Sequence, residues 1–386
     1  MTTAQRLAPF GQTIFAEITA LAVKHDAVNL GQGFPNFDGP DFIKDAAIAA
    51  VRDGRNQYAP TNGIPELRAA IAAHFAARSG LDTAAEAVTV TSGCTEAIPA
   101  TLLGLVDPGQ EVVVFEPYYD SYRACIAMAG ATPRFVTLRP PDFAFDPAEL
   151  RAAFGPRTRA IIVNTPHNPS GKVFDRAELE LIASLCRDHD VIAITDEVYE
   201  HLVFEGEHHT LAAFDGMAER TVTLSSLGKT FSLTGWKIGW AIAPPALAAG
   251  VRSAHQFLTY ATATPLQHGA VAALRAPASY FEAFRAAYRR RRDQLVDGLS
   301  ALGFRVRPPA GTYFVLADHT PFGFDDDVAF CRHLIEDAGV AAIPPSAFYH
   351  DPADGRTLVR FAFCKDEATL ADALTRMERH LPALKR

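Results

Sequence analysis

Short, continuous runs of apolar and β-branched residues alternate along most of this chain with Ala- and Leu-rich segments of helical period. A strand that is apolar on both faces must be covered on both faces, which is typical of a mostly parallel sheet between layers of helices. In such a sheet, ligands bind at the carboxyl ends of the strands. The pattern predicts strands at residues 87–91, 111–115, 160–164, 191–195 and 221–224, and helices that include 94–105 and 176–189.

The C-terminal part of the chain has a different pattern. Residues 279–303 predict one long helix, and strand-like pieces follow at 312–317 and 357–363. These elements predict a smaller α+β domain packed on the large α/β domain. The predicted division is an N-terminal arm with part of the small domain (1–40), a large domain (41–280) and a C-terminal small domain (281–386).

The composition is that of a folded protein without a general nucleic-acid-binding surface. Hydrophobic residues make up 48% of the 386 residues, and the formal net charge is -8. The five cysteines are scattered without a C-x-x-C pair, so we expect no disulfide framework, no metal site and a reducing compartment. The first ten residues lack the apolar core of a secretory leader, and no apolar stretch approaches about 18 residues, so we expect a cytoplasmic protein that does not enter a membrane.

Two nucleotide-binding motifs are incomplete. A G-x-G begins at Gly31, but Asn36 occupies the position of the third glycine. Lys229 and Thr230 end a segment like a P-loop, but Thr223 stands where that loop needs its first glycine. These departures disfavour a dinucleotide-binding enzyme and a P-loop NTPase.

Three features at predicted strand ends are informative together. Lys229, one of only seven lysines, lies among glycines and hydroxyl residues, where an amine can have a lowered pKa and attack an aldehyde. Asp196 follows a very apolar strand, so its carboxylate should be buried and needs a positive partner. Residues 92–95 join a strand to a helix whose first amides can bind phosphate. A loop lysine, a salt bridge and a plain turn would explain them singly, but together they describe a site for pyridoxal phosphate (PLP).

Six motifs are spread over nearly the whole chain. They are NLGQGFP at 29–35, QYAPTNGIPELR at 57–68, NTPHNPSGK at 164–172, TDEVYEHLVF at 195–204, SSLGKTFSLTGWKIG at 225–239 and VRFAFCKDE at 359–367. With these motifs in family order, the chain resembles the fold type I, class I/II PLP-dependent aminotransferases, and it is most similar to their kynurenine, glutamine and methionine aminotransferase branch. The resemblance implies a large domain with a mostly parallel sheet between helices and a smaller α+β domain.

The resemblance implies a role for each residue around the cofactor ring. Lys229 matches the lysine that binds PLP covalently and then moves the Cα proton of the substrate. Asp196 matches the partner that keeps the pyridine nitrogen protonated. Tyr199 and Asn168 match the hydrogen-bond donors to the ring 3-oxygen, and Tyr119 matches the aromatic residue stacked on the ring.

The resemblance also implies a phosphate site shared between two subunits. Gly228 stands where other branches often have serine, which removes one hydroxyl from this site. Tyr58 matches a tyrosine that reaches the phosphate of the neighbouring subunit, so a homodimer with shared active sites is expected. The residues that match the phosphate cradle within one chain are Gly93, Cys94, Ser226 and Lys237, the last of which is arginine in many relatives.

The substrates implied are an amino acid and a 2-oxo acid. Arg360 matches the arginine that binds the substrate α-carboxylate through two parallel hydrogen bonds, and Gly33 and Asn168 complete this pocket. No second arginine lies in a motif that the family uses for a side-chain carboxylate. We therefore expect a neutral or aromatic donor of the methionine, glutamine, phenylalanine or kynurenine type, and we expect aspartate to be a poor donor.

Three other functions stay open at this point. The chain is similar to aminotransferases that act on N-succinyldiaminopimelate, and the same site could serve a cysteine-S-conjugate β-lyase. A PLP-sensing regulator is disfavoured because the resemblance begins within the first thirty residues, which leaves no room for a preceding DNA-binding domain. We expect His25, His167 and His201 to be structural.

Overall fold

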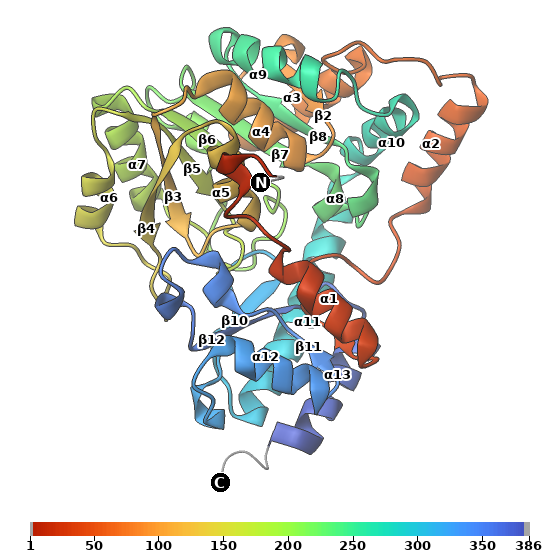
Figure 1. Cartoon of the computed structure of the whole chain (residues 1–386). Helices are drawn as coiled ribbons and strands as arrows, with labels where there is room; N and C mark the ends of the chain where they lie inside the picture. Colours follow the sequence, from red (N-terminus) through yellow and green to blue (C-terminus); the bar gives the residue numbers. More distant parts are fainter. Residues whose placement is uncertain (1–2, 382–386) are drawn as a thin grey trace.

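A seven-stranded, mostly parallel sheet forms the centre of the molecule (Figure 1). The computed structural model describes residues 3–381. The strand order is β2-β8-β7-β6-β5-β3-β4, with β8 antiparallel to both of its neighbours and the other pairs parallel. This confirms the predicted α/β fold. The strands are β2 (Val88–Thr91), β3 (Glu111–Glu116), β4 (Thr132–Thr137), β5 (Thr158–Asn164), β6 (Ile192–Asp196), β7 (Thr221–Ser226) and β8 (Gly239–Ile242).

Helices cover both faces of this sheet because its strands bury side chains on both sides. In β3, Val112 and Val114 belong to one buried cluster and Val113 and Phe115 to another, since successive side chains of a strand point to opposite faces. The first cluster includes α4 (Cys94–Leu105), α5 (Asp120–Met128) and α9 (Pro245–Leu258), and the second includes α6 (Pro147–Ala153) and α7 (Arg176–Asp188). A third joins β2 and β8 to α2 (Asp41–Arg52), α3 (Pro65–Ser79) and α10 (Thr264–Leu274).

The C-terminal elements form smaller sheets with their own helices. A three-stranded antiparallel sheet has the order β12-β10-β9, and β1 pairs in parallel with β11. Helix α1 lies against these elements (Figure 1), because Ile18 and Ala22 pack with Ile335 and Ile343. The division at residues 40 and 280 stays a prediction. The elements are α1 (Ile14–Lys24), β1 (Val28–Asn29), α11 (Ala278–Leu302), β9 (Arg305–Val306), β10 (Phe314–Asp318), α12 (Asp327–Glu336), β11 (Val340–Ala341), β12 (Leu358–Ala362) and α13 (Glu367–His380).

Several predicted strand ends differ from the structure by one or a few residues, and two of these differences bear on the site. Asp196 was expected after its strand, but it is the last residue of β6 and pairs with Asn164 of β5 and Leu224 of β7. Strand β7 continues through Ser226, because Ser225 and Ser226 pair with Trp240 and Gly239 of β8. The ladder with neighbouring strands extends both ends beyond the apolar runs from which they were predicted.

Close contact between two glycines fixes the position of α4. A Cβ atom at Gly104 would lie 2.2 Å from the carbonyl oxygen of Gly250 in α9, so both helices need glycine at this crossing. At the other end, Gly93 precedes α4 with a φ of 74°, a left-handed conformation that glycine adopts without strain. Residues 3–381 contain no helix that is both long and apolar enough to cross a membrane.

Candidate active site

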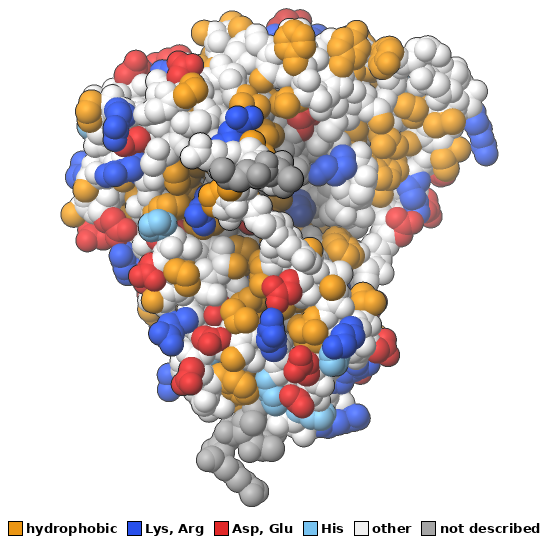
Figure 2. Space-filling view, viewed as in Figure 1, with side chains coloured by type: hydrophobic (Ala, Val, Ile, Leu, Met, Phe, Trp, Pro, Cys, Tyr) orange, Lys and Arg blue, Asp and Glu red, His pale blue; other side chains and the backbone are white. Residues whose placement is uncertain are grey.

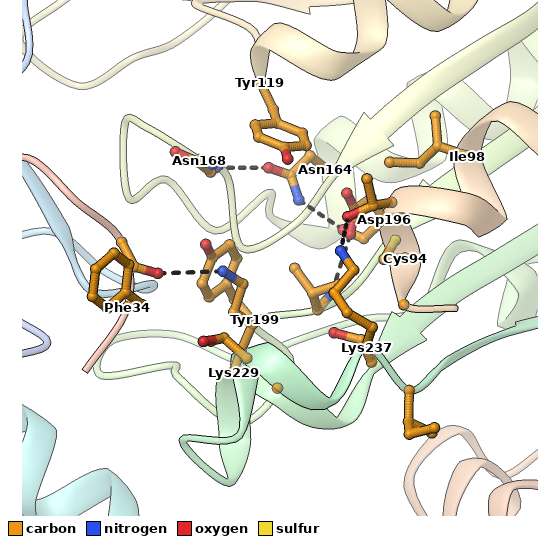
Figure 3. A pocket seen from close by; sticks show the side chains of 18 of the residues that line it. Phe34, Cys94, Ile98, Tyr119, Asn164, Asn168, Asp196, Tyr199, Lys229 and Lys237 are labelled. Atoms are coloured by element: carbon orange, nitrogen blue, oxygen red, sulfur yellow. Dashed lines mark hydrogen bonds between the residues drawn. The ribbon is translucent and has the colours of Figure 1, made fainter. Parts of the chain in front are cut away.

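A cavity of about 270 Å³ lies at the carboxyl ends of β2, β5, β6 and β7 (Figure 3). Its lining comes from segments that are far apart in the sequence. Strand ends, the start of α4 and the short helix α8 (Leu227–Thr230) all contribute. The predicted site residues that line it are Gly33, Gly93, Cys94, Tyr119, Asn168, Asp196, Tyr199, Ser226, Lys229 and Lys237.

Lys229 projects from α8 into this cavity (Figure 3). Its Nζ atom donates a hydrogen bond to the Tyr313 hydroxyl at 2.9 Å and approaches the Gly33 carbonyl oxygen at 3.4 Å. Burial lowers the pKa of Lys229 below its ordinary value. A lowered pKa increases the fraction of the neutral amine, which is the form that attacks a carbonyl group.

Asp196 is a buried carboxylate at the end of β6, with only 4% of its surface exposed. The Tyr122 hydroxyl donates to Oδ2 at 2.6 Å, and the Val198 amide donates to Oδ1 at 3.3 Å. Burial raises the pKa of Asp196 despite these hydrogen bonds. Asp196 forms no salt bridge among residues 3–381, so a positive group in the cavity would supply the missing counter-charge.

Asn164 joins two of the strand ends. Its side-chain amide donates to the Asp196 carbonyl oxygen at 2.8 Å, and its Oδ1 atom accepts from the Asn168 amide at 2.7 Å. Tyr119 and Tyr199 complete the wall, and both are mostly buried. Tyr119, Asn168 and Lys229 lie on different sides of this cavity (Figure 3).

The start of α4 provides an anion site at one end of the cavity. Its first amides have no partner within the helix, and Lys237 lies beside them, with Nζ donating to the Thr95 hydroxyl at 2.7 Å. The backbone of Gly93 packs against the side chain of Lys237, because a Cβ atom added to Gly93 would lie 3.3 Å from Cε of Lys237. Cys94 is the first residue of α4, and burial raises the pKa of its thiol well above the ordinary value.

A buried pair behind α4 supports this anion site. Glu96 accepts from the Ser92 amide at 2.5 Å, and its Oε1 atom lies 2.7 Å from Nδ1 of His255 in α9. The other ring nitrogen of His255 lies 2.8 Å from the Thr61 carbonyl oxygen. Burial alone would lower the pKa of His255, but the hydrogen bond to Glu96 outweighs it and raises the pKa.

Arg360 provides a second anion site at the opposite end. Its side chain is 2% exposed, with Nη2 donating to the Gly31 carbonyl oxygen at 2.8 Å and Nη1 to Oδ1 of Asn168 at 3.4 Å. Its Nε atom is buried without a hydrogen-bond partner among residues 3–381. Burial lowers the pKa of Arg360 to about 10, so the guanidinium is still charged near neutral pH. Such a buried donor set fits a carboxylate.

The wall beside Arg360 is aromatic and carries one carboxylate. A second cavity, of about 200 Å³, shares Asn168 and Lys229 with the first and is lined by Phe15, Phe34 and Phe314 together with Asp120, the first residue of α5. The Arg360 guanidinium is 4.3 Å from the centroid of Phe314. Burial raises the pKa of Asp120 more than nearby Arg360 lowers it. A ligand side chain here would meet apolar rings and a hydrogen-bond acceptor.

Sequence reasoning missed three polar groups of the site. Tyr122 holds Asp196, Tyr313 holds Lys229, and Asp120 faces the substrate end. Asp120 directly follows the predicted Tyr119. Tyr122 lies three residues after Tyr119, and this helical spacing was a usable signal for it. Nothing local distinguishes Tyr313, which reaches Lys229 across 84 residues of sequence.

Tyr58 lies outside the cavity of its own chain. Its side chain is 84% exposed, and its ring packs edge-on against Tyr260 at 5.4 Å. Phe257 and Leu258, which lie close to Tyr260 in the sequence, are also exposed, with 84% and 45% of their surfaces accessible. Its predicted role in the phosphate site of a second subunit stays a prediction.

The fold and site define a class of enzyme. The model of the family "Aminotransferase class I and II" matches residues 25–377, and the chain belongs to this family of PLP-dependent aminotransferases. The expected family, fold class and cofactor are therefore confirmed.

Individual relatives are similar over nearly their whole length. The probable N-succinyldiaminopimelate aminotransferase of Mycobacterium tuberculosis is 50% identical, covering 97% of this chain and 98% of the relative. The solved structure of the M. tuberculosis enzyme has a TM-score of 0.95 at 51% identity and covers 98% of this chain and 100% of its own. The methionine aminotransferase of Escherichia coli is 41% identical (96% and 97% covered), and human kynurenine–oxoglutarate transaminase 1 is 39% identical (95% and 95%).

The residues present fit PLP on their own chemistry. A buried amine, a buried carboxylate without a salt bridge and a helix start with a nearby cation correspond to the aldehyde, the pyridine nitrogen and the phosphate of this cofactor. Each of these groups lines the same cavity.

We expect His255→Gln to destabilise the enzyme in a pH-dependent way. Loss of a hydrogen bond to a charged group costs about 1.5–3 kcal/mol. Because the pKa of His255 is raised on folding, its contribution is complete below the ordinary histidine pKa of about 6.5 and is lost as the pH rises through the folded value. Thermal unfolding should show a larger loss of Tm at about pH 6 than at about pH 9.

The matched control is His189→Gln, which replaces an exposed histidine at the end of α7. Its Tm should follow the parent enzyme at both pH values. An equal loss of Tm for His255→Gln at both pH values would show that the charge of this histidine contributes nothing.

Proposed function

We propose that this aminotransferase takes its amino group from a donor whose side chain is uncharged near Cα, such as methionine, glutamine, phenylalanine or kynurenine, and passes it to a 2-oxo acid. The supporting observation is the surroundings of Arg360, where one buried cation faces aromatic rings and the carboxylate of Asp120. Arg360 is the cation for the α-carboxylate, and a second carboxylate on the donor would meet Asp120.

The proposed roles follow from the contacts. Bound PLP would supply an aldehyde and an electron-withdrawing ring. Lys229 would hold the cofactor through its buried amine, and the same amine would move the proton of substrate Cα. Asp196 would hold the pyridine nitrogen, since a buried carboxylate is stabilised by a positive partner. Tyr313 orients the Lys229 amine through the 2.9 Å hydrogen bond.

The remaining predicted residues hold the two ends of the ligands. Arg360 and the side chain of Asn168 orient the substrate carboxylate, and the Gly33 backbone closes this end because a Cβ atom there would lie 2.6 Å from Phe314. Tyr199 and Asn168 would hold the ring 3-oxygen, and Tyr119 would pack against the ring. The amides of Gly93 and Cys94, with Ser226 and Lys237, hold the phosphate.

A second donor has its own supporting observation. The relative at 50% identity is named a probable N-succinyldiaminopimelate aminotransferase, and it spans 97% of this chain. In that donor the extra carboxylates lie far from Cα. Its amide N–H could donate a hydrogen bond to the carboxylate of Asp120. This donor is therefore compatible with the same pocket, whereas aspartate places its second carboxylate close to Cα.

The active unit proposed is a cytoplasmic homodimer with shared sites. Exposed aromatic groups gather at Tyr58, Phe257 and Tyr260, of which Tyr58 and Tyr260 are in contact. Exposed apolar groups of this size are typical of a surface that is covered by another protein. The same surface carries the tyrosine that is expected to reach the neighbouring phosphate.

Lys229 should be the residue that carries the cofactor. The purified protein should be yellow, and reduction with borohydride should fix the cofactor to Lys229, as peptide mapping would show. Lys229→Ala should lose all measurable turnover, whereas Lys44→Ala, which removes an ion-paired lysine outside the cavity, should keep it. Label on Lys237 would refute this assignment.

Mixing two inactive variants tests the shared sites. Lys229→Ala and Tyr58→Ala proteins should each have reduced activity, and their heterodimers should contain one site with both residues intact. Activity should therefore return on mixing toward the level of one sound site per dimer. If subunits exchange, as tagged and untagged chains would report, and no activity returns, the sites are not shared.

A donor panel with one fixed 2-oxo acid tests the substrate proposal. Methionine or glutamine should exceed aspartate in kcat/KM by tenfold or more, which corresponds to about 1.4 kcal/mol of transition-state binding. Asp120→Asn should raise kcat/KM for aspartate relative to methionine, because the like charge is removed. Arg360→Lys should instead lower kcat/KM for every donor.

N-succinyldiaminopimelate belongs in the same panel. If kcat/KM for this donor exceeds that for methionine by tenfold, the second candidate donor is the correct one. The Asp120→Asn variant would then still test the role of Asp120. A tenfold lead of aspartate would refute both donors.

A further inference from the structure

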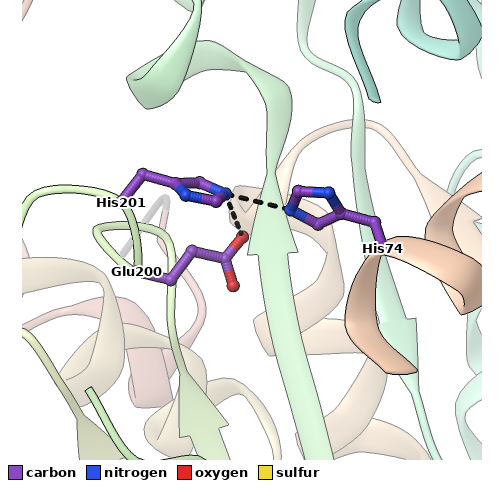
Figure 4. Close-up of side chains that lie close together, drawn as sticks. All are labelled: His74, Glu200 and His201. Carbon is purple, nitrogen blue, oxygen red and sulfur yellow. Dashed lines mark hydrogen bonds and ion pairs between the residues drawn. The ribbon is translucent and has the colours of Figure 1, made fainter. Parts of the chain in front are cut away.

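Two histidines and a glutamate meet outside the cofactor cavity (Figure 4). His74 projects from α3, and Glu200 and His201 lie in the turn after β6, close in sequence to Asp196. The Nε2 atoms of the two rings are 2.9 Å apart, and Nε2 of His201 is 3.8 Å from Oε1 of Glu200. The proposed catalytic roles use none of these three side chains.

Burial favours the neutral form of both rings, and neutral imidazole is the form that binds metal ions. In the present contact one Nε2 must carry a proton and donate it to the other. A shift of that proton to Nδ1 within one ring would free both Nε2 lone pairs without any change of charge.

The distances are close to those of a tetrahedral zinc site. Zinc binds imidazole nitrogen and carboxylate oxygen at about 2.0–2.2 Å, so neighbouring ligand atoms lie about 3.4 Å apart. The observed separations of 2.9 Å and 3.8 Å lie on either side of this value. Small rotations of side chains would therefore equalise them, and all three ligand atoms already lie within 4.8 Å of one another.

The charges nearby leave one oxygen of Glu200 for a cation. Arg78 is 2.5 Å from Oε2 of Glu200 and 3.1 Å from Glu197, so this arginine occupies the other oxygen. Ser225 donates to Oε1 at 3.1 Å, which orients the ligand oxygen and leaves it a second lone pair. The side chains of Glu200 and His201 are only 6% and 15% exposed, which limits competition from water.

We propose that His74, Glu200 and His201 form a binding site for one divalent transition-metal ion, with zinc favoured by the two-nitrogen, one-oxygen ligand set and water in the fourth position. The ion would tie α3 to the turn that follows Asp196 and contains Tyr199. It would act as a cross-link between these elements rather than in the chemistry of transamination.

The test uses tag-free holoenzyme titrated with Zn²⁺ and Co²⁺. Calorimetry and metal analysis should give one ion per chain, and bound Co²⁺ should give visible bands at longer wavelength than the yellow cofactor. His74→Gln and His201→Gln should each weaken binding by about tenfold or more. His189→Gln, at the exposed end of α7, should bind as the parent does.

A measurement on the unchanged chain guards against variants that fold poorly. Zn²⁺ should protect His74 and His201 from acylation by diethyl pyrocarbonate, as mapped by mass spectrometry, and leave His189 reactive. Absence of binding, equal binding by His201→Gln and His189→Gln, or unchanged acylation of His74 and His201 in the presence of Zn²⁺ would each overturn the proposal.

Discussion

The parallel pairing of β5, β6 and β7 is the constraint on which the whole site depends. In this register Asn164 pairs with Asp196, and Ser226 ends the next strand. Because parallel strands end at the same edge of a sheet, polar groups from three distant segments face one cavity without a long supporting loop. Burial on both faces of the sheet fixes the register, since a slip of one residue would exchange the side chains on the two faces.

Three buried ionisable groups, Asp196, Lys229 and Arg360, line the two adjoining cavities of the site. Ligand groups of opposite charge could bind beside Asp196 and Arg360. Asp196 and Arg360 are nearly inaccessible, and burial shifts the pKa values of Asp196 and Lys229 toward their neutral forms. A buried charge is costly unless a group of opposite charge lies beside it. A pyridinium nitrogen and a substrate carboxylate would supply the opposite charges, which links the binding of cofactor and substrate to the stability of the site.

Donor choice rests on different residues from cofactor binding. The phosphate and ring contacts come from strand ends and α4, whereas the substrate end is lined by Phe15, Phe34 and Asp120 from loops and helix starts. Relatives named for methionine, kynurenine and N-succinyldiaminopimelate share one fold with this chain. Loop residues can vary without disturbing the sheet, which is why one scaffold serves several donors.

The class of fold and the cofactor could be predicted from the sequence, and the structure brings most of the predicted site residues to one cavity. Apolar runs of strand length, and short motifs such as the one around Lys229, depend on neighbours in the chain and are legible from it. Only the tertiary structure decided that Tyr313 would meet Lys229 across 84 residues and that His74 would meet His201 across 127. Such contacts arise from the packing of separate elements, and no local periodicity encodes which side chains face each other once the elements are packed.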